Sequence, residues 1–335
     1  MQEDRYRYLA ENPGTYIRFI YHLSDIHINN DSYSDHEYKK IFDAITYTLK
    51  KICEHDHSVI IMTGDLIDTK ANISAKVLKL LNYFLRNILK IAPIIIIAGN
   101  RDCNLNKSDD VLKSVIEMLN ILNDENIYTS NGEIYNRIYY LRKSGYYKFH
   151  NLVLGYTSLL DTKFIDWDNK NKFNIDNDGI YKIALYHGKV NHSKETDIAI
   201  VNKYYNVCDF DGYDYVLLGG NKCFNFLNGQ ETIAYSGSLI QRGYDEVIGN
   251  QGILEWNLEK ATHTFHIIEH NYGYLTINIK NGEMIYMHIP KRARIRFNIE
   301  NTDYETYEKI WDKIRSKYLL CKLEPKLPPF KIKKK

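Results

Sequence analysis

The stretch "YIRFIYHLSDIHI" (residues 16–28) decides the fold, because a run of β-branched and aromatic residues ends there in a carboxylate and an imidazole. Residues 16–23 predict a buried strand. Asp25 and His27 follow, two positions apart. On extended backbone such residues point to the same face, so we expect their side chains to lie together. Divalent metals accept this donor pair, although the pair alone is a weak signal.

Two further strands follow, each after a helix. The runs "SVIIMT" (58–63) and "PIIIIA" (93–98) predict strands, and apolar residues at helical spacing predict helices over about 38–52 and 74–89. This β-α-β-α-β order predicts parallel neighbours in one sheet. Ligands bind beyond the carboxyl ends of such strands, so the residues that follow them should meet. They are Asp25, His27, Asp65, Asn100 and Asp102, and His187 ends a later strand.

A second set of strands predicts the overall fold class. The runs at 151–158, 182–187, 215–219 and 232–237, and a meander over 253–279, predict a second sheet packed on the first. We therefore expect an α/β protein, a two-sheet β-sandwich flanked by helices. The strand "RIRFNIE" (294–300) and an apolar helical stripe over 304–318 predict a small C-terminal α/β cap. The predicted boundaries are an N-terminal extension (1–14), a main domain (15–285), a partial capping domain (286–322) and a basic tail (323–335).

Composition narrows the class of protein. The 335 residues are 44% hydrophobic, enough for one large core, and the net charge is only +2. The five cysteines form no C-x-x-C pair, which indicates reduced thiols rather than a disulfide framework. Neither a membrane span nor a signal peptide is predicted, so we expect a soluble, intracellular protein. The 29 tyrosines, with many Ile, Lys and Asn residues, fit an AT-rich genome such as that of a large DNA virus.

The motifs D-x-H, G-D-x-x-D, G-N-x-D and H-G, in this order, resemble the calcineurin-like metallophosphoesterase superfamily. The segments "DYVLLG" (214–219) and "FLNGQETIAYSGSLIQRGYDE" (226–246) resemble, more narrowly, the nuclease subunit of SbcD-type DNA repair exonucleases. The resemblance covers about residues 15–260 and implies a four-layer α/β/β/α fold with two Mn²⁺ or Mg²⁺ ions. It implies that Asp25 and His27 hold the first ion, that Asp65 bridges, and that Asn100 and His187 hold the second.

Three positions depart from the family pattern. The family's last motif is G-H-x-H, and its two histidines fall on Gly220 and Lys222. Glycine offers no ligand, and a lysine ammonium has donors only, so Lys222 and an ion should exclude each other. Arg101 replaces the histidine that protonates the leaving oxygen. Arg101 and Asp102 thus occupy the catalytic positions, where Asp102 is either the ion-pair partner of Arg101 or structural, and Arg101 and Lys222 could bind phosphate.

Two functions of different class remain open. In the first, the chain is a pseudo-nuclease, in which Lys222 pairs with Asp25 and Asp65 and the cleft grips DNA without cutting it. In the second, it is an active Mn- or Mg-dependent phosphodiesterase with a rearranged site, or with a single ion at Asp65, Asn100 and His187. A relic that only scaffolds partners is a third reading. The resemblance implies DNA as a partner, a homodimer, and an SMC-like ATPase for which little chain remains beyond residue 322.

Overall fold

The computed structural model describes residues 6–10, 15–68, 73–103, 114–119, 138–161, 163–167, 179–191, 205–284, 289–318 and 322–326. The chain divides into two units. The first contains residues 1–240 and 251–268, and the second contains residues 241–250 and 269–335. No helix in the described ranges combines the length and the apolar character that a membrane crossing needs.

A six-stranded sheet carries the predicted β-α-β-α-β run. Strands β2 (Phe19–Leu23), β3 (Ser58–Met62), β4 (Ile94–Ile97) and β5 (Ile138–Leu141) lie parallel in this order. Beyond β2, the sheet continues with β14 (Gly252–Asn257) and β15 (Thr262–Ile267), both antiparallel to their neighbours. The prediction that this meander belongs to the second sheet was wrong. Alternating apolar residues identify a strand but not the edge on which it pairs, and here the hairpin covers the free edge of β2.

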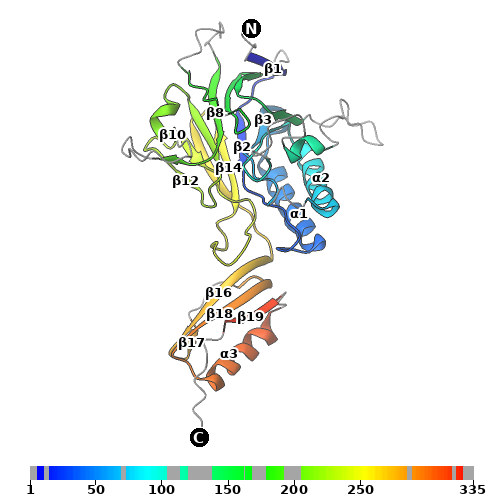
Figure 1. The fold of residues 1–335 in the computed structure, drawn as a ribbon, viewed down its shortest axis with the longest axis vertical. Coiled ribbons are helices and arrows are strands. Elements are labelled where there is room, and N and C mark those ends of the chain that lie inside the picture. Colours follow the sequence, from blue (N-terminus) through cyan, green and yellow to red (C-terminus); the bar gives the residue numbers. More distant parts are fainter. Residues whose placement is uncertain are drawn as a thin grey trace. The chain divides into compact units, whose positions relative to one another are not determined.

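Two helices cover the face of this sheet that points away from the other sheet, as Figure 1 shows. Helix α1 (Asp35–Ile52) begins at a capping box formed by Ser34 and Glu37, and α2 (Ala75–Leu89) begins at the N-cap Ser74. Their apolar stripes are buried, and the rings of Phe42 and Phe84 meet with centroids 4.8 Å apart. Both helices lie where the apolar spacing predicted them.

A seven-stranded sheet forms the second layer. It contains β1 (Tyr6–Ala10), β6 (Gly145–Phe149), β7 (Leu152–Thr157), β8 (Tyr181–His187), β11 (Tyr215–Gly219), β13 (Ile233–Tyr235) and β12 (Asn225–Phe226), in this order. The predicted N-terminal extension is therefore part of the fold where it is described, because β1 pairs parallel with β6 at the edge. The short strands β9 (Val190–Asn191) and β10 (Tyr205–Asn206) form a separate pair.

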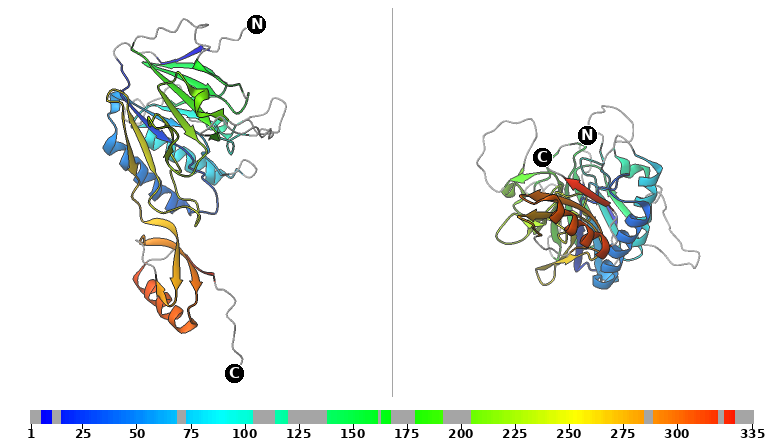
Figure 2. Two further views of the ribbon diagram at one scale, coloured as in Figure 1. Left: turned by 90° about the vertical axis from the view of Figure 1, so that its left-hand side faces the viewer. Right: turned by 90° about the horizontal axis from the view of Figure 1, so that it is seen from below.

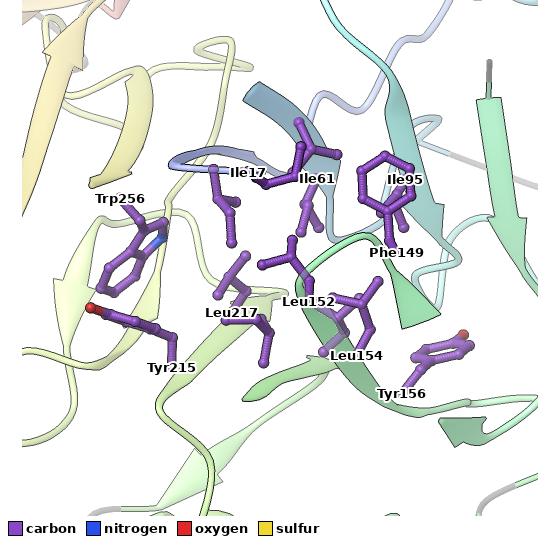
Figure 3. Close-up of a cluster of buried hydrophobic side chains, with 14 of the residues drawn as sticks. Ile17, Ile61, Ile95, Phe149, Leu152, Leu154, Tyr156, Tyr215, Leu217 and Trp256 are labelled. Atoms are coloured by element: carbon purple, nitrogen blue, oxygen red, sulfur yellow. The ribbon is translucent and has the colours of Figure 1, made fainter. Parts of the chain in front are cut away.

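The two sheets bury a shared apolar core, which confirms the predicted sandwich. Side chains from the first sheet, such as Ile61 and Ile95, meet Leu154 and Leu217 from the second (Figure 3). Each such side chain contributes about 1.5–3 kcal/mol through burial. On the outer face of the seven-stranded sheet, a second cluster that includes Tyr186 and Phe210 packs under the 3₁₀-helix η5 (Val207–Phe210).

The second unit has its own sheet and core. Strands β17 (Glu283–Met284), β16 (Tyr272–Lys280), β18 (Arg292–Glu300) and β19 (Lys322–Lys326) lie in this order, and α3 (Tyr304–Lys317) covers one face (Figure 2). Phe297 is fully buried between this sheet and the helix, with its ring centroid 5.8 Å from that of Tyr307. The predicted strand and helix of the small α/β cap are both present.

The boundaries of this unit differ from those expected at 286 and 323. Strand β16 joins it because nine of its residues pair with β18, and residues 241–250 join it through Gln241. The amide of Gln241 donates to the carbonyl of Tyr274 at 2.8 Å and accepts from its N–H at 2.7 Å. Residues 322–326, placed mostly in the predicted tail, form the edge strand β19, where Pro325 is tolerated because an edge strand leaves half of its N–H groups unpaired.

Candidate metal centre

The site lies where the loops after β2 and β3 run side by side. Backbone N–H groups of Asp25 and His27 donate to the carbonyls of Gly64 and Asp65 at 3.0 and 2.9 Å. Asp25, His27 and Asp65 have φ angles of 53°, 51° and 53°. The expectation of extended backbone at Asp25 and His27 was therefore wrong, although their side chains do meet. Left-handed backbone at three non-glycine residues is strained, and such strain is found mainly at functional sites.

The first donor set consists of Asp25, His27 and Asp65. Nε2 of His27 lies 3.2 Å from Oδ1 of Asp25 and 3.5 Å from Oδ2 of Asp65. All three residues are buried, with exposed fractions of 3%, 3% and 4%. Their ligand atoms lie within 4.8 Å of one another. Three buried donors of this kind, on one side of the Asp65 carboxylate, can hold one divalent cation.

The second donor set lies on the other side of Asp65. Nε2 of His187, at the end of β8, is 3.5 Å from Oδ1 of Asp65. Oδ1 of Asn100 lies 3.1 Å from that Nε2 and 3.1 and 3.2 Å from the two carboxylate oxygens of Asp65. The Nδ1–H of His187 donates to the carbonyl of Thr63 at 2.7 Å, so the neutral form of this imidazole has its lone pair on Nε2. The structure thus brings together all five residues that the resemblance assigned to metals.

The chemistry of this second set fits a cation. With the Asn100 oxygen inward, an amide oxygen, two carboxylate oxygens and an imidazole lone pair face one another, which is unfavourable unless a positive ion lies between them. With the amide nitrogen inward, Asn100 would donate to these same atoms, so the site without an ion has its own satisfied arrangement. An ion about 2.1 Å from each ligand, at angles of 90–110°, needs ligands about 3.0–3.4 Å apart. The separations of 3.1–3.5 Å between His27 and the two carboxylates, and among Asn100, His187 and Asp65, lie within or just above that range. The three ligand atoms of the first set all lie within 4.8 Å of one another.

The charges at the site also favour the binding of a cation. Burial opposes ionisation of Asp25, but hydrogen bonds from His27, Ser24 and Gly220 and the charge of His187 outweigh it, so the pKa of Asp25 is lowered. For His187, burial lowers the pKa, but the carboxylates of Asp65 and Asp25 raise it by a larger amount. The pKa of His187 is therefore raised overall. The negative potential that raises the pKa of His187 would equally attract a divalent cation.

Asp102 holds the loops of the site in place and is not itself one of the metal donors. Its Oδ1 accepts from the N–H groups of Leu66 and Ile67 at 2.9 and 3.2 Å, and its Oδ2 accepts from Gly99 at 2.9 Å. The side chain is buried and does not pair with Arg101, so that half of the prediction was wrong. Burial and the nearby Asp65 raise the pKa of Asp102 to about 7. Its carboxyl group ties the loop of Asp65 to the loop of Asn100.

Asp68 is a residue whose role the sequence did not specify. Its Oδ1 lies 3.6 Å from Nδ1 of His27, a buried nitrogen with no hydrogen bond among the described residues. A carboxylate behind a metal-binding imidazole fixes the tautomer that leaves Nε2 free for the ion. The G-D-x-x-D spacing was the available signal, but it did not distinguish this role from helix capping.

The departures at Gly220 and Lys222 affect the two donor sets differently. The N–H of Gly220, at φ 99°, donates to Oδ2 of Asp25 at 2.9 Å. A Cβ atom there would lie 3.2 Å from Nε2 of His187, closer than ordinary van der Waals contact, so the backbone of Gly220 passes directly beside the second set. Lys222 is exposed, and the ion pairs of Asp25 and Asp65 are with His27 and His187. The structure therefore does not place the Lys222 ammonium between the carboxylates.

Arg101 contacts the donor set through its backbone and faces solvent with its side chain. Its backbone N–H donates to Oδ1 of Asp65 at 2.8 Å, while its side chain is exposed. One guanidinium nitrogen, Nη1, reaches the carbonyl of Asp68 at 3.5 Å. A guanidinium held beside a cluster of acceptors is suited to hold a phosphate that approaches from solvent.

The sequence pattern of the calcineurin-like phosphoesterases matches residues 20–221, which contain both donor sets. The chain belongs to the calcineurin-like phosphoesterase family. Members of this family use divalent metals, in agreement with the donor sets around Asp65.

A viral protein is similar to nearly the whole chain. "Uncharacterized protein R555" of Acanthamoeba polyphaga mimivirus is 37% identical over 322 residues, which cover 94% of this chain and 23% of that protein. This calcineurin-like phosphoesterase chain thus spans less than a quarter of the length of that relative. A giant-virus relative agrees with the expectation drawn from the composition.

Proposed function

We propose that this chain is a divalent-metal-dependent phosphodiesterase of the SbcD type that acts on DNA. The observation that supports this proposal most strongly is the pair of three-donor sets that share the carboxylate of Asp65. Their separations of 3.1–3.5 Å suit Mn²⁺ or Mg²⁺ on each side of that residue. Asp25 and His27 would hold one ion, and Asn100 and His187 the other.

The residues of this chain have separate tasks in that reaction. Bound ions would supply Lewis-acid stabilisation for the charge that develops on the phosphoryl oxygens. Asp65 is kept in place by the N–H of Arg101, and His187 by the carbonyl of Thr63. Gly220 is exposed and offers no ligand beside the second donor set, which would leave that side of the set to water or a substrate oxygen. The Arg101 guanidinium would hold the scissile phosphate.

Support for DNA comes from the resemblance of residues 214–246 to SbcD-type nucleases and from the giant-virus relative. Viral genome repair is a setting that would use such an activity. A pseudo-nuclease that binds DNA without cutting it is the second candidate. The observation that favours it is the replacement of two ligand positions by Gly220 and Lys222 and of the proton-donating histidine by Arg101.

Hydrolysis and DNA binding should be measured on the same preparation. Bis-p-nitrophenyl phosphate and a labelled DNA duplex are incubated with Mn²⁺, Mg²⁺ or EDTA, and DNA binding is followed by fluorescence anisotropy. We expect Mn²⁺-stimulated hydrolysis that is lost in Asp65→Asn, a substitution that tolerates the left-handed backbone at this position. Asp31→Ala, at an exposed position, is the matched control. DNA binding that persists without any hydrolysis would favour the pseudo-nuclease.

A further inference from the structure

None of the imidazoles at the site, and none of the carboxyl groups of Asp25, Asp65 and Asp102, is placed to give a proton to a leaving group. His27 and His187 direct Nε2 at the carboxylates, and Nδ1 of His187 is bonded to the carbonyl of Thr63. His22 is fully buried behind them, and its Nε2 is bonded to the hydroxyl of Thr63 at 2.9 Å. Each of these imidazoles is therefore committed to a ligand or structural contact.

The carboxyl group of Asp102 is also unsuited to this task. It is 1% exposed, and both of its oxygens face backbone N–H groups. A proton on Asp102 could not reach a substrate without breaking the contacts that hold Leu66, Ile67 and Gly99. Asp25 and Asp65 are themselves metal-donor carboxylates that accept hydrogen bonds from Gly220 and Arg101.

Arg101 replaces proton donation with a fixed positive charge. Its exposed guanidinium makes one described contact, the 3.5 Å bond to the carbonyl of Asp68, so most of its five N–H donors remain available within the described part of the chain. A guanidinium stays protonated at neutral pH, and it binds phosphate oxygens in pairs. It can stabilise a departing group that is an anion, but it cannot neutralise a departing alkoxide by proton transfer.

We infer that this site selects phosphoanhydrides, either a nucleoside triphosphate or the 5′-triphosphate end of a polynucleotide, over unactivated phosphodiesters. The inference rests on the proposed metal-dependent hydrolysis, and it moves the preferred bond in a DNA substrate from the internal phosphodiesters to the anhydride of a 5′-triphosphate end. A water oxygen forms the new bond to phosphorus, and the bond from that phosphorus to the bridging anhydride oxygen breaks. The electron pair leaves with the departing phosphate, which pairs with Arg101, and the water releases one proton to solvent.

The chemistry of the two leaving groups explains the selectivity. A phosphate has a second pKa of about 6, so it leaves as a stable anion without receiving a proton. An alkoxide is about as basic as hydroxide, whose conjugate acid, water, has a pKa of about 15.7. A positioned general acid usually contributes about 10²–10⁴-fold to such a step. Without one, phosphodiester cleavage should lose about this factor, whereas anhydride cleavage should not.

The test uses the full chain in Mn²⁺ and compares its activity on substrates with different leaving groups. The substrates are ATP, a DNA oligonucleotide with a 5′-triphosphate, the same oligonucleotide with a 5′-hydroxyl, and bis-p-nitrophenyl phosphate. We expect at least one anhydride to be cleaved about 10²-fold faster, in kcat/KM, than the 5′-hydroxyl oligonucleotide. The ATP and 5′-triphosphate substrates distinguish a free nucleotide from a polynucleotide end.

Two substitutions at Arg101 test separately the effect of its positive charge and the effect of its lack of a transferable proton. Arg101→Gln should lower kcat/KM for the preferred anhydride by about 10²-fold. Arg101→His, which restores a titratable group, should narrow the gap between the anhydride and the 5′-hydroxyl oligonucleotide. Arg142→Gln, which removes an exposed guanidinium that pairs with Glu117 and contacts none of the donor residues, should change neither rate.

Each other outcome would count against a defined part of this reasoning. Equal rates on the anhydrides and the 5′-hydroxyl oligonucleotide would overturn the inference and leave metal-dependent hydrolysis intact. The same holds if only bis-p-nitrophenyl phosphate is cleaved, or if Arg101→Gln is as active as the parent chain on the anhydride. No turnover of any substrate in Mn²⁺ would overturn the proposed function, and the inference with it.

Discussion

Replacing Asp102 tests whether one buried carboxyl group holds the loops of the metal centre together. Asp102→Ala leaves three N–H groups, those of Leu66, Ile67 and Gly99, without their acceptor. At about 2 kcal/mol for each buried donor, the loss is about 6 kcal/mol. The substitution also removes a carboxylate whose pKa is raised from 3.8 to about 7, which relieves on the order of 4 kcal/mol at pH 8. We therefore expect a net loss of about 2 kcal/mol in the free energy of unfolding at pH 8.

The pH dependence gives this prediction a second, sharper form. Because its folded pKa is raised, Asp102 holds more protons in the folded state than in the unfolded state between about pH 4 and 7, so its contribution to stability falls as pH rises through that window. The parent chain has this pH dependence and Asp102→Ala does not. The amount by which the free energy of unfolding of the parent exceeds that of Asp102→Ala should therefore grow by roughly 3 kcal/mol from pH 8 to pH 5.

Urea unfolding in EDTA, followed by tryptophan fluorescence, measures both quantities. EDTA removes metal, whose charge would otherwise change the pKa of Asp102. Asp31→Ala, at an exposed position, should remain within about 0.5 kcal/mol of the parent at both pH values. A difference for Asp102→Ala that is under 1 kcal/mol at both pH values, or that shrinks toward pH 5, would refute the reasoning.

Three further predictions concern the ions and the second unit. At a hundredfold excess over Kd, Mn²⁺ should stabilise the parent chain by about 2.7 kcal/mol, seen as a higher melting temperature. This stabilisation should disappear in Asp65→Asn. An unchanged shift in melting temperature would exclude Asp65 as the shared ligand. Lys222→His should tighten Mn²⁺ binding about tenfold in calorimetry, whereas an equal gain in Lys222→Ala would mean that charge rather than coordination was limiting. Phe297→Ala, which empties a fully buried position between sheet and helix, should cost about 3–5 kcal/mol, seen as an earlier urea transition, and a loss below 1 kcal/mol would show that this core is not a stability determinant.

The sequence predicted the strands and helices well because their periodicity reflects burial on one face or on both. It could not predict where β14 and β15 pair, since Leu254 and Trp256 would be buried on either sheet. The boundary of the second unit was also beyond it. That boundary depends on the amide of Gln241, which bonds to the backbone of Tyr274, thirty-three positions along the chain. Contacts over such a separation leave no periodic trace in the sequence.

The composition of the donor sets could be predicted, but their backbone geometry could not. Motif order and strand ends were enough to bring Asp25, Asp65 and His187 to one place. The left-handed backbone at Asp25 and Asp65 had no signal, because aspartate is common in many conformations. For Asp102 the sequence left an ion pair with Arg101 and a structural role both open, and the structure uses its carboxyl group for backbone N–H groups.

The expectation of an inactive site depended on where the Lys222 ammonium lies, and its exposure removes that argument. An exposed ammonium is screened by solvent and salt, so its repulsion of an ion within the buried donor sets is small compared with that of a buried one. What remains of the departure is one missing ligand on each side of Asp65. Catalytic metals commonly have three protein ligands and an open position, which is the arrangement that each set leaves. The loss of two ligands is therefore compatible with the proposed hydrolysis, and we infer that the stronger restriction comes from Arg101, whose fixed charge suits groups that leave as anions.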